Sequence, residues 1–397
     1  MSKYSEEIKT DAALHTAAKL YPYIRSLSKY DGPNCETSDG LITAKNLDSL
    51  VQLCDRNAMV VDLSAHLDRL GLIQDLGMDS QQLIVVRKAQ LAHYEKQLIE
   101  QLKLICGVFN DANIDYVLLK GAGLVAGGYT SVIGQRYLAD IDVLVLPSDL
   151  DRVLQVMQGI GFSTELKLIE PVSSYWKTKH LPPLSRNGFR YRVECHQKPF
   201  EHTFRFKSPY STEEVMSSRC VTNIEDINVF VPCAEHLLLS SFYHSQIFDI
   251  GDLARRDNYR AMLDVSLILR SRPNNFDWGL VSTIVESRNY TRAFHRFLNR
   301  TLEIFDPTLL SLIDLSLPDE KSATMDKLIG RNSKRGSLFF NCVLHAREIA
   351  RAASSDGRMQ RKMLLQANPD NWKYLPIYRQ LISPNAIKER LKYFLFD

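Results

Sequence analysis

One short run constrains this chain more than any other: Asp140-Ile-Asp-Val-Leu-Val-Leu146, which is rich in β-branched residues and is followed by Pro147. These features predict a β-strand that ends at the proline. Side chains two residues apart point to the same side of a strand, so Asp140 and Asp142 project together. Adjacent carboxylates repel each other unless a cation offsets their charge. The run therefore predicts a site for Mg²⁺ or Mn²⁺, hard ions that bridge carboxylates and substrate phosphates.

The segment before this strand predicts a helix, a strand and a glycine-rich turn. Apolar residues spaced by three or four predict the helix, namely Leu91, Tyr94, Leu98, Leu102, Ile105 and Phe109. The run Tyr116–Leu119 has the length of a buried strand. Four glycines between Gly121 and Gly128 then indicate a turn and a helix start. After Pro147, Ser148 is predicted to cap a helix that ends at Gly159 or Gly161.

A third strand is predicted at Phe189–His196, where apolar and polar residues alternate. Its polar face carries Glu194 and His196. Metal-dependent transfer of phosphoryl groups commonly uses a third carboxylate, and Glu194 is our candidate. His196 lies on the same face and is a candidate to orient an acceptor or to act as a general base. The predicted chemistry thus rests on residues from two strands.

Composition places the chain among ordinary globular proteins. It has 397 residues, of which 45% are hydrophobic and 24% charged, and its net charge of +3 gives no argument for nucleic acid as an obligatory partner. Its sequence contains no membrane-spanning run and no signal peptide, so we expect a cytoplasmic protein without a membrane partner. Neither its seven scattered cysteines nor its histidines have zinc-site spacing, and we expect no zinc.

The motifs LLKGAGL at 118–124, RYLADIDVLV at 136–145 and VECH at 193–196 resemble the bacterial uncharacterised nucleotidyltransferase family. They are also similar to the nucleotidyltransferase toxins of abortive-infection systems. The resemblance covers about 110–270 and includes His244 and Asp264 at later family positions. The residue pattern predicts an α+β fold with an N-terminal helical region at 1–110, a centre at 111–232 and a C-terminal helical region at 233–397, and the resemblance implies that the centre is a small nucleotidyltransferase-type mixed sheet core.

The resemblance also implies residue roles. Asp140, Asp142 and Glu194 would hold the metal ion, and a nucleoside triphosphate such as ATP would lie near Lys120, Gly121 and Arg136. From the residues alone, Arg136 is equally well explained by an ion pair with a nearby acid, and Lys120 by simple solvation. Arg260 is expected on the solvated face of a helix.

Two functions remain open. The first is a metal-dependent nucleotidyltransferase that moves a nucleoside monophosphate to a small hydroxyl or amino compound, a tRNA or a protein, and releases pyrophosphate. The second is a catalytically weak module of the same fold that acts through a nucleotide or a protein partner. The second is favoured by one departure: the superfamily's usual Gly-Ser is Gly121-Ala122 here, so a hydroxyl that often holds phosphate is missing.

Overall fold

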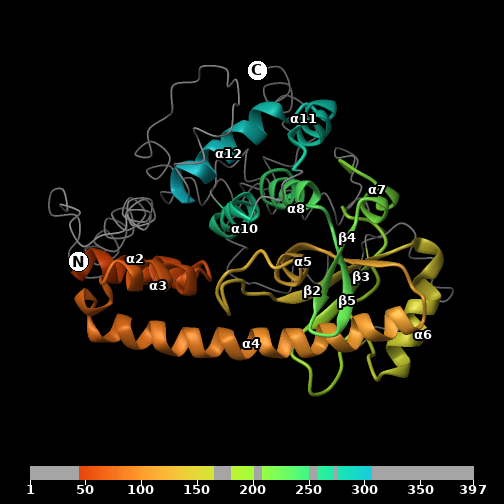
Figure 1. The fold of residues 1–397 in the computed structure, drawn as a ribbon, viewed down its shortest axis with the longest axis horizontal. Helices are drawn as coiled ribbons and strands as arrows, with labels where there is room; N and C mark the ends of the chain where they lie inside the picture. Colours follow the sequence, from red (N-terminus) through yellow and green to blue (C-terminus); the bar gives the residue numbers. More distant parts are fainter. Residues whose placement is uncertain (1–43, 165–179, 201–207, 250–257, 272–275, 306–397) are drawn as a thin grey trace, which may run out of the picture. The chain divides into compact units, whose positions relative to one another are not determined.

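The computed structural model describes residues 44–164, 180–200, 208–249, 258–271 and 276–305 (Figure 1). By its internal contacts the chain divides into two compact units, residues 1–325 and 326–397, and every described residue belongs to the first. The three-part division with boundaries after residues 110 and 232 stays a prediction.

Between residues 91 and 196 the described elements follow the order expected from the sequence. The helices before the sheet are α2 (Ala44–Arg56), α3 (Val60–Arg69), the 3₁₀ turn η1 (Ile73–Asp75) and α4 (Met78–Asp111). The central elements are β1 (Tyr116–Leu118), α5 (Lys120–Ala126), β2 (Asp140–Val145), η2 (Pro147–Asp149), α6 (Leu150–Gly159), β3 (Arg192–His196), α7 (Thr212–Ser217), β4 (Cys220–Ile224) and β5 (Ile227–Val231). The later helices are α8 (Ala234–Phe242), the π-helical η4 (Tyr243–Phe248), α10 (Tyr259–Arg270), α11 (Trp278–Ser287) and α12 (Thr291–Phe305).

The sheet is small and mixed. Its strand order is β1-β2-β3, with β1 antiparallel and β3 parallel to β2. Strands β4 and β5 form a separate antiparallel hairpin. In the parallel pair, Asp142 lies directly opposite Glu194. With helices before and after the strands, the α+β class predicted from the sequence is confirmed (Figure 1).

A different apolar core covers each face of β2. Ile141, Val143 and Val145 belong to one cluster together with residues of α4 and α6. Leu144 points the other way, into a cluster shared with α2, α3, α8, α10 and α12. Because side chains alternate along a strand, Asp140 and Asp142 lie on the same side as Leu144. The carboxylates therefore lie at the beginning of one face of β2, and the other end of that face is buried in the apolar core.

Strand β3 is shorter than predicted because helix α4 takes over its first backbone groups. The buried amide of Gln101 donates to the Tyr191 carbonyl at 2.6 Å and accepts from the Tyr191 N–H at 3.2 Å. These bonds satisfy the two groups that a strand ladder would otherwise pair. The prediction of a strand from Phe189 is thus wrong for its first residues, and β3 begins at Arg192.

Helix α6 also begins differently from the prediction. Ser148 lies inside the 3₁₀ turn η2, and α6 takes Asp149 as its N-cap without a side-chain cap bond. The predicted Ser148 cap is therefore wrong, because Pro147 starts a tighter turn there. The predicted end at Gly159 is confirmed.

The connection between α5 and β2 is fixed by the helices that precede the sheet. Glu95 of α4 accepts from the backbone N–H of Gly134 at 2.7 Å. Gln135 donates at 2.8 Å to Asp62 of α3, and both side chains are buried. Residues 44–111 therefore help to place the segment that leads into Asp140. Across the described part of the chain, every helix is too short or too polar to span a membrane.

Candidate active site

Four of the side chains selected from the sequence meet where β2, β3 and the start of α5 lie together. Lys120 Nζ lies 2.6 Å from Asp142 Oδ1, and His196 Nε2 lies 2.7 Å from the same oxygen. His196 Nε2 is also 3.3 Å from Glu194 Oε2. Asp142 is 3% exposed and His196 0% exposed. One carboxylate oxygen thus contacts two basic groups in a site shielded from water.

The grouping is a direct result of strand register. Asp142 and Glu194 are cross-strand neighbours in the parallel pair, so their side chains project to the same face. His196 follows two residues after Glu194 and shares that face. Lys120 follows β1, which pairs with β2 on its other side. Two paired strands and the helix start that follows β1 therefore supply the cluster.

Charge in this cluster shifts several pKa values. Burial alone would raise the pKa of Asp142, but contact with His196 and the charge of Lys120 hold it well below its usual range. Contact with His196 also lowers the pKa of Glu194, against the effect of its partial burial. Burial opposes the charge of Lys120, yet the nearby Asp142 raises the Lys120 pKa. The cluster therefore favours ionised carboxylates beside a protonated lysine.

Asp140 differs from Asp142 in its surroundings. It is half-buried at the first position of β2, opposite the exposed Arg192. Burial raises the pKa of Asp140, and the charge of Asp142 raises it further. Repulsion between the two carboxylates is thus only partly offset by Lys120. A divalent cation would remove that repulsion.

The donor set fits a divalent metal ion. Asp142, Glu194 and His196 each offer one ligand atom, and these three atoms lie within 4.8 Å of one another. Neither nitrogen of the buried His196 ring has a partner in hydrogen-bond geometry, although Nε2 lies 2.7 Å from Asp142 Oδ1 as an ion pair. Polar atoms buried without a well-directed partner are uncommon and often mark an absent ion or water.

Backbone strain accompanies the site at Lys120. This residue is the first of α5 and has a φ of +49°, which non-glycine residues rarely adopt. Such a conformation costs on the order of 1 kcal/mol and persists only where the surroundings enforce it. Here the ion pair with Asp142 contributes to that enforcement.

Arg136 forms the ion pair that the sequence left open. Its guanidinium makes a two-pronged contact with Asp264 of α10, at 2.7 Å through Nε and 3.0 Å through Nη2. The two side chains are 12% and 7% exposed. Arg136 also lies directly over Gly121, where an added Cβ would come within 3.5 Å of its guanidinium carbon. Asp264 thus offsets the charge of Arg136 beside the start of α5.

Sequence reasoning missed two residues near the site. His180 pairs across from His196 at the outer side of β3, and its Nε2 is 3.7 Å from Glu194 Oε2. Its position before a run with prolines gave no periodic signal. Arg260 is half-buried, 5.5 Å from the Tyr137 ring, so its predicted place on a solvated face is wrong. His244, by contrast, is partly exposed and pairs with Asp249 at 3.1 Å.

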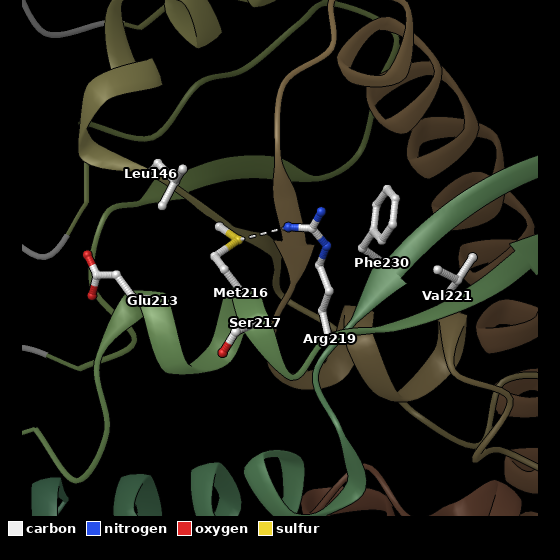
Figure 2. Close-up of a pocket in the computed structure, with 7 residues that line it drawn as sticks. All are labelled: Leu146, Glu213, Met216, Ser217, Arg219, Val221 and Phe230. Carbon is white, nitrogen blue, oxygen red and sulfur yellow. Dashed lines mark hydrogen bonds between the residues drawn. The ribbon is translucent and has the colours of Figure 1, made fainter.

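A groove of about 640 Å³ lies at the opposite end of β2. Leu146, Met216, Arg219 and Phe230 are among the residues that line it (Figure 2). Arg219 already pairs with Asp115 at 2.6 Å and lies over the Phe230 ring. None of the sequence-selected site residues lines this groove, which is about 13 Å along the strand from Asp142 at 3.3 Å per residue. The groove is therefore separate from the carboxylate cluster.

Two solved structures are weakly similar to this chain. The solution structure of the antibiotic-resistance factor ANT(2'')-Ia is 12% identical, with a TM-score of 0.32 over 51% of this chain and 95% of that one. A nucleotidyltransferase-like antigen from Paracoccidioides brasiliensis is 15% identical, with a TM-score of 0.32 over 51% and 93%. Similarity at this level carries no argument of its own. Among curated proteins, none matches the sequence.

The comparison that assigns the chain is with a family model. Residues 43–306, well over half of the chain, match the model described as uncharacterised nucleotidyltransferase. The matched range contains every site residue selected from the sequence. A bacterial source and a likeness to abortive-infection toxins stay predictions. The chain belongs to the uncharacterised nucleotidyltransferase family.

Proposed function

We propose that this protein transfers a nucleoside monophosphate from a nucleoside triphosphate to an acceptor and releases pyrophosphate, with the help of a divalent cation. The observation that carries the proposal is the register of β2 and β3, which sets Asp142 opposite Glu194 with Asp140 on the same face. Three carboxylates on one face of adjacent strands are the ligand set that such transfer uses. The cation would lie between Asp140, Asp142 and Glu194.

In the proposed reaction, an oxygen or nitrogen of the acceptor forms a bond to the α-phosphorus while the bond to pyrophosphate breaks. The acceptor's proton is released to solvent. The bound cation supplies charge stabilisation to the phosphate oxygens. The protein's own contribution is to hold the carboxylates ionised and in fixed positions, which the low pKa of Asp142 and Glu194 reflects.

Lys120 has a specific part in this proposal. Its Nζ lies 2.6 Å from Asp142 Oδ1, the oxygen that a cation would contact. Two cations cannot share that oxygen at such a distance without repulsion. Cation binding would therefore release Lys120 from Asp142, and its ammonium group would then be free to contact the triphosphate.

For His196 we propose a role other than acceptor orientation or general base catalysis. Its side chain is fully buried and contacts Asp142 and Glu194. A group with no exposed surface cannot reach an acceptor that enters from solvent. We therefore assign His196 to the carboxylate cluster instead of to acceptor activation.

The test is a transfer assay. The purified protein is incubated with Mg²⁺ or Mn²⁺ and each labelled ribonucleoside triphosphate, with cell RNA, protein and a metabolite extract as acceptors. Asp142→Asn should abolish transfer, whereas Asp151→Asn, a matched change at an exposed position of α6, should leave it unchanged. The labelled product identifies the acceptor class. Equal transfer by wild type and Asp142→Asn would overturn the proposal.

A weak nucleotide-binding module is the second candidate, and one observation favours it. Ala122 is 1% exposed and belongs to the apolar cluster under the sheet. A hydroxyl for phosphate is therefore absent at this position, and the residue serves packing. Isothermal titration with nucleoside triphosphates would separate the two candidates: Mg²⁺-dependent binding without transfer to any acceptor would support the module.

A further inference from the structure

The inference concerns His196, a fully buried imidazole without well-directed hydrogen bonds. Its exposed fraction is 0%, and neither ring nitrogen has a partner in hydrogen-bond geometry. Nε2 nevertheless lies in ion-pair contact with oxygens of Asp142 and Glu194. This ring nitrogen and the two carboxylates together offer a set of donors for a cation.

The spacing of the three atoms matches a shared ion. His196 Nε2 lies 2.7 Å from Asp142 Oδ1 and 3.3 Å from Glu194 Oε2. Neighbouring ligands of an octahedral ion, each about 2.1 Å from it, are about 3 Å apart. The two separations from Nε2 bracket that value, and all three ligand atoms lie within 4.8 Å of one another. A small relaxation of the side chains would therefore bring all three atoms into contact with one ion.

The chemistry of the donors then limits which ion fits. Mg²⁺ takes oxygen ligands almost exclusively and keeps much of its water. Imidazole nitrogen suits first-row transition ions, and carboxylates suit Mn²⁺ as well as Mg²⁺. Two carboxylates and one imidazole in a buried position therefore favour Mn²⁺ over Mg²⁺.

We propose that His196 is a metal ligand, and that Asp142, Glu194 and His196 form a position selective for a transition ion such as Mn²⁺. The inference rests on the proposed function, since it concerns the cation of the same site. It extends that function by adding a nitrogen ligand to the predicted carboxylates. Asp140 would then face a second, oxygen-only position that shares Asp142.

The experiment is Mn²⁺ binding to the full chain, followed by pulsed electron paramagnetic resonance. Nitrogen bound to Mn²⁺ gives a ¹⁴N coupling that oxygen ligands do not give. We expect this coupling in the wild type, together with tighter binding of Mn²⁺ than of Mg²⁺ by titration calorimetry. His196→Asn should remove the coupling and weaken Mn²⁺ binding by at least roughly 10- to 100-fold, the loss typical of removing even an indirect metal partner.

Two controls make the result specific. His180→Asn changes a second imidazole that lies 3.7 Å from Glu194 but outside the three-ligand group. His244→Asn changes a partly exposed histidine on η4. Both variants should keep the ¹⁴N coupling. Absence of the coupling in the wild type, or its persistence in His196→Asn, would overturn the proposal.

The experiment distinguishes three outcomes: a variant that does not fold, a protein that does not transfer nucleotides, and a His196 that does not bind the metal ion. If His196→Asn does not fold, His196→Gln and the wild-type spectrum still decide whether a nitrogen ligand exists. A ¹⁴N coupling without any nucleotide transfer would support the metal site and contradict the proposed function. Transfer with Mg²⁺ alone, without ¹⁴N coupling in the Mn²⁺ form, would give the opposite result.

Discussion

Replacing Asp264 with asparagine tests whether the Arg136–Asp264 pair holds the later helices to the sheet region. The change keeps side-chain size but leaves the Arg136 guanidinium buried without its counter-charge. At an effective dielectric constant of about 20, unit charges about 4 Å apart attract by about 4 kcal/mol. Breaking a buried pair from one side typically costs about 3–5 kcal/mol. We therefore expect Asp264→Asn to lower the free energy of unfolding by about 4 kcal/mol.

The reverse change should cost less. Burial already raises the pKa of Asp264, so this carboxyl can take up a proton once Arg136 is gone. An arginine cannot lose its charge in the same way. Arg260 also lies near both residues, and in Asp264→Asn the two guanidinium groups would face each other without a carboxylate. Arg136→Met should therefore destabilise the protein less than Asp264→Asn does.

Urea denaturation followed by tryptophan fluorescence measures these differences. The double variant Arg136→Met/Asp264→Leu should recover much of the loss, because it removes both buried charges together. A titration of each folded variant with nucleoside triphosphate separates stability from binding. A decrease in the free energy of unfolding of less than about 1 kcal/mol in Asp264→Asn would refute the reasoning, because breaking a buried ion pair from one side destabilises a protein by more than this. Unchanged stability with reduced triphosphate affinity in Arg136→Met would instead establish a phosphate contact.

Three further predictions concern the elements that support the site. Gln101→Leu leaves two backbone groups of Tyr191 unpaired and should cost about 2–5 kcal/mol in urea denaturation, whereas the exposed Gln82→Leu should change stability by less than about 0.5 kcal/mol. Gly134 has a φ of +79°, and an added Cβ would lie only 2.9 Å from Leu91, whereas Gly128 has a φ of +71° and open space around it. Gly134→Ala should therefore lower the melting temperature more than Gly128→Ala does. Equal shifts in melting temperature would contradict the close packing. Burial raises the pKa of the Cys106 thiol to about 12, so the unfolded chain loses this proton first as pH rises above about 9. Cys106 therefore does not lower the free energy of unfolding below a pH of about 9, and above that pH this free energy should fall by about 1.4 kcal/mol per pH unit. Cys106→Ala should show a shallower fall. Parallel curves of stability against pH for wild type and variant would argue against the buried thiol.

Local patterns in the sequence sufficed for the central strands. The Asp140–Val145 strand has β-branched residues, an alternating face and a terminating proline, all of which are set within a few residues. The shared face of Asp140 and Asp142 then follows from the geometry of one strand, whereas Glu194 joins them through the register of β2 and β3. The alternation around Glu194 likewise placed it correctly on a polar strand face.

Contacts between distant residues could not be predicted in this way. Arg136 and Asp264 are 128 residues apart, and no periodic signal connects them. The shortened start of β3 depends on Gln101, which is 90 residues before Tyr191 and looks like an ordinary polar residue of a helix. Arg260 appeared solvated for the same reason, because its partners come from the β2 connection. Pairings of this kind depend on the packed chain and not on local sequence.

These long-range contacts also explain how a small sheet can hold a charged cluster. The sheet has one strand on each side of β2. The face of β2 that bears the carboxylates is charged at Asp140 and Asp142, and it packs into the apolar core only from Leu144 onward. Such a face cannot stabilise its own first residues by apolar packing. Instead, Gln101 fixes the start of β3, Glu95 fixes Gly134 ahead of β2, and the Arg136–Asp264 pair fixes the same connection from α10. Helix α4, which precedes the sheet in the sequence, and helix α10, which follows it, are therefore part of the scaffold that positions the carboxylates. A change in either helix should disturb the site as well as the fold.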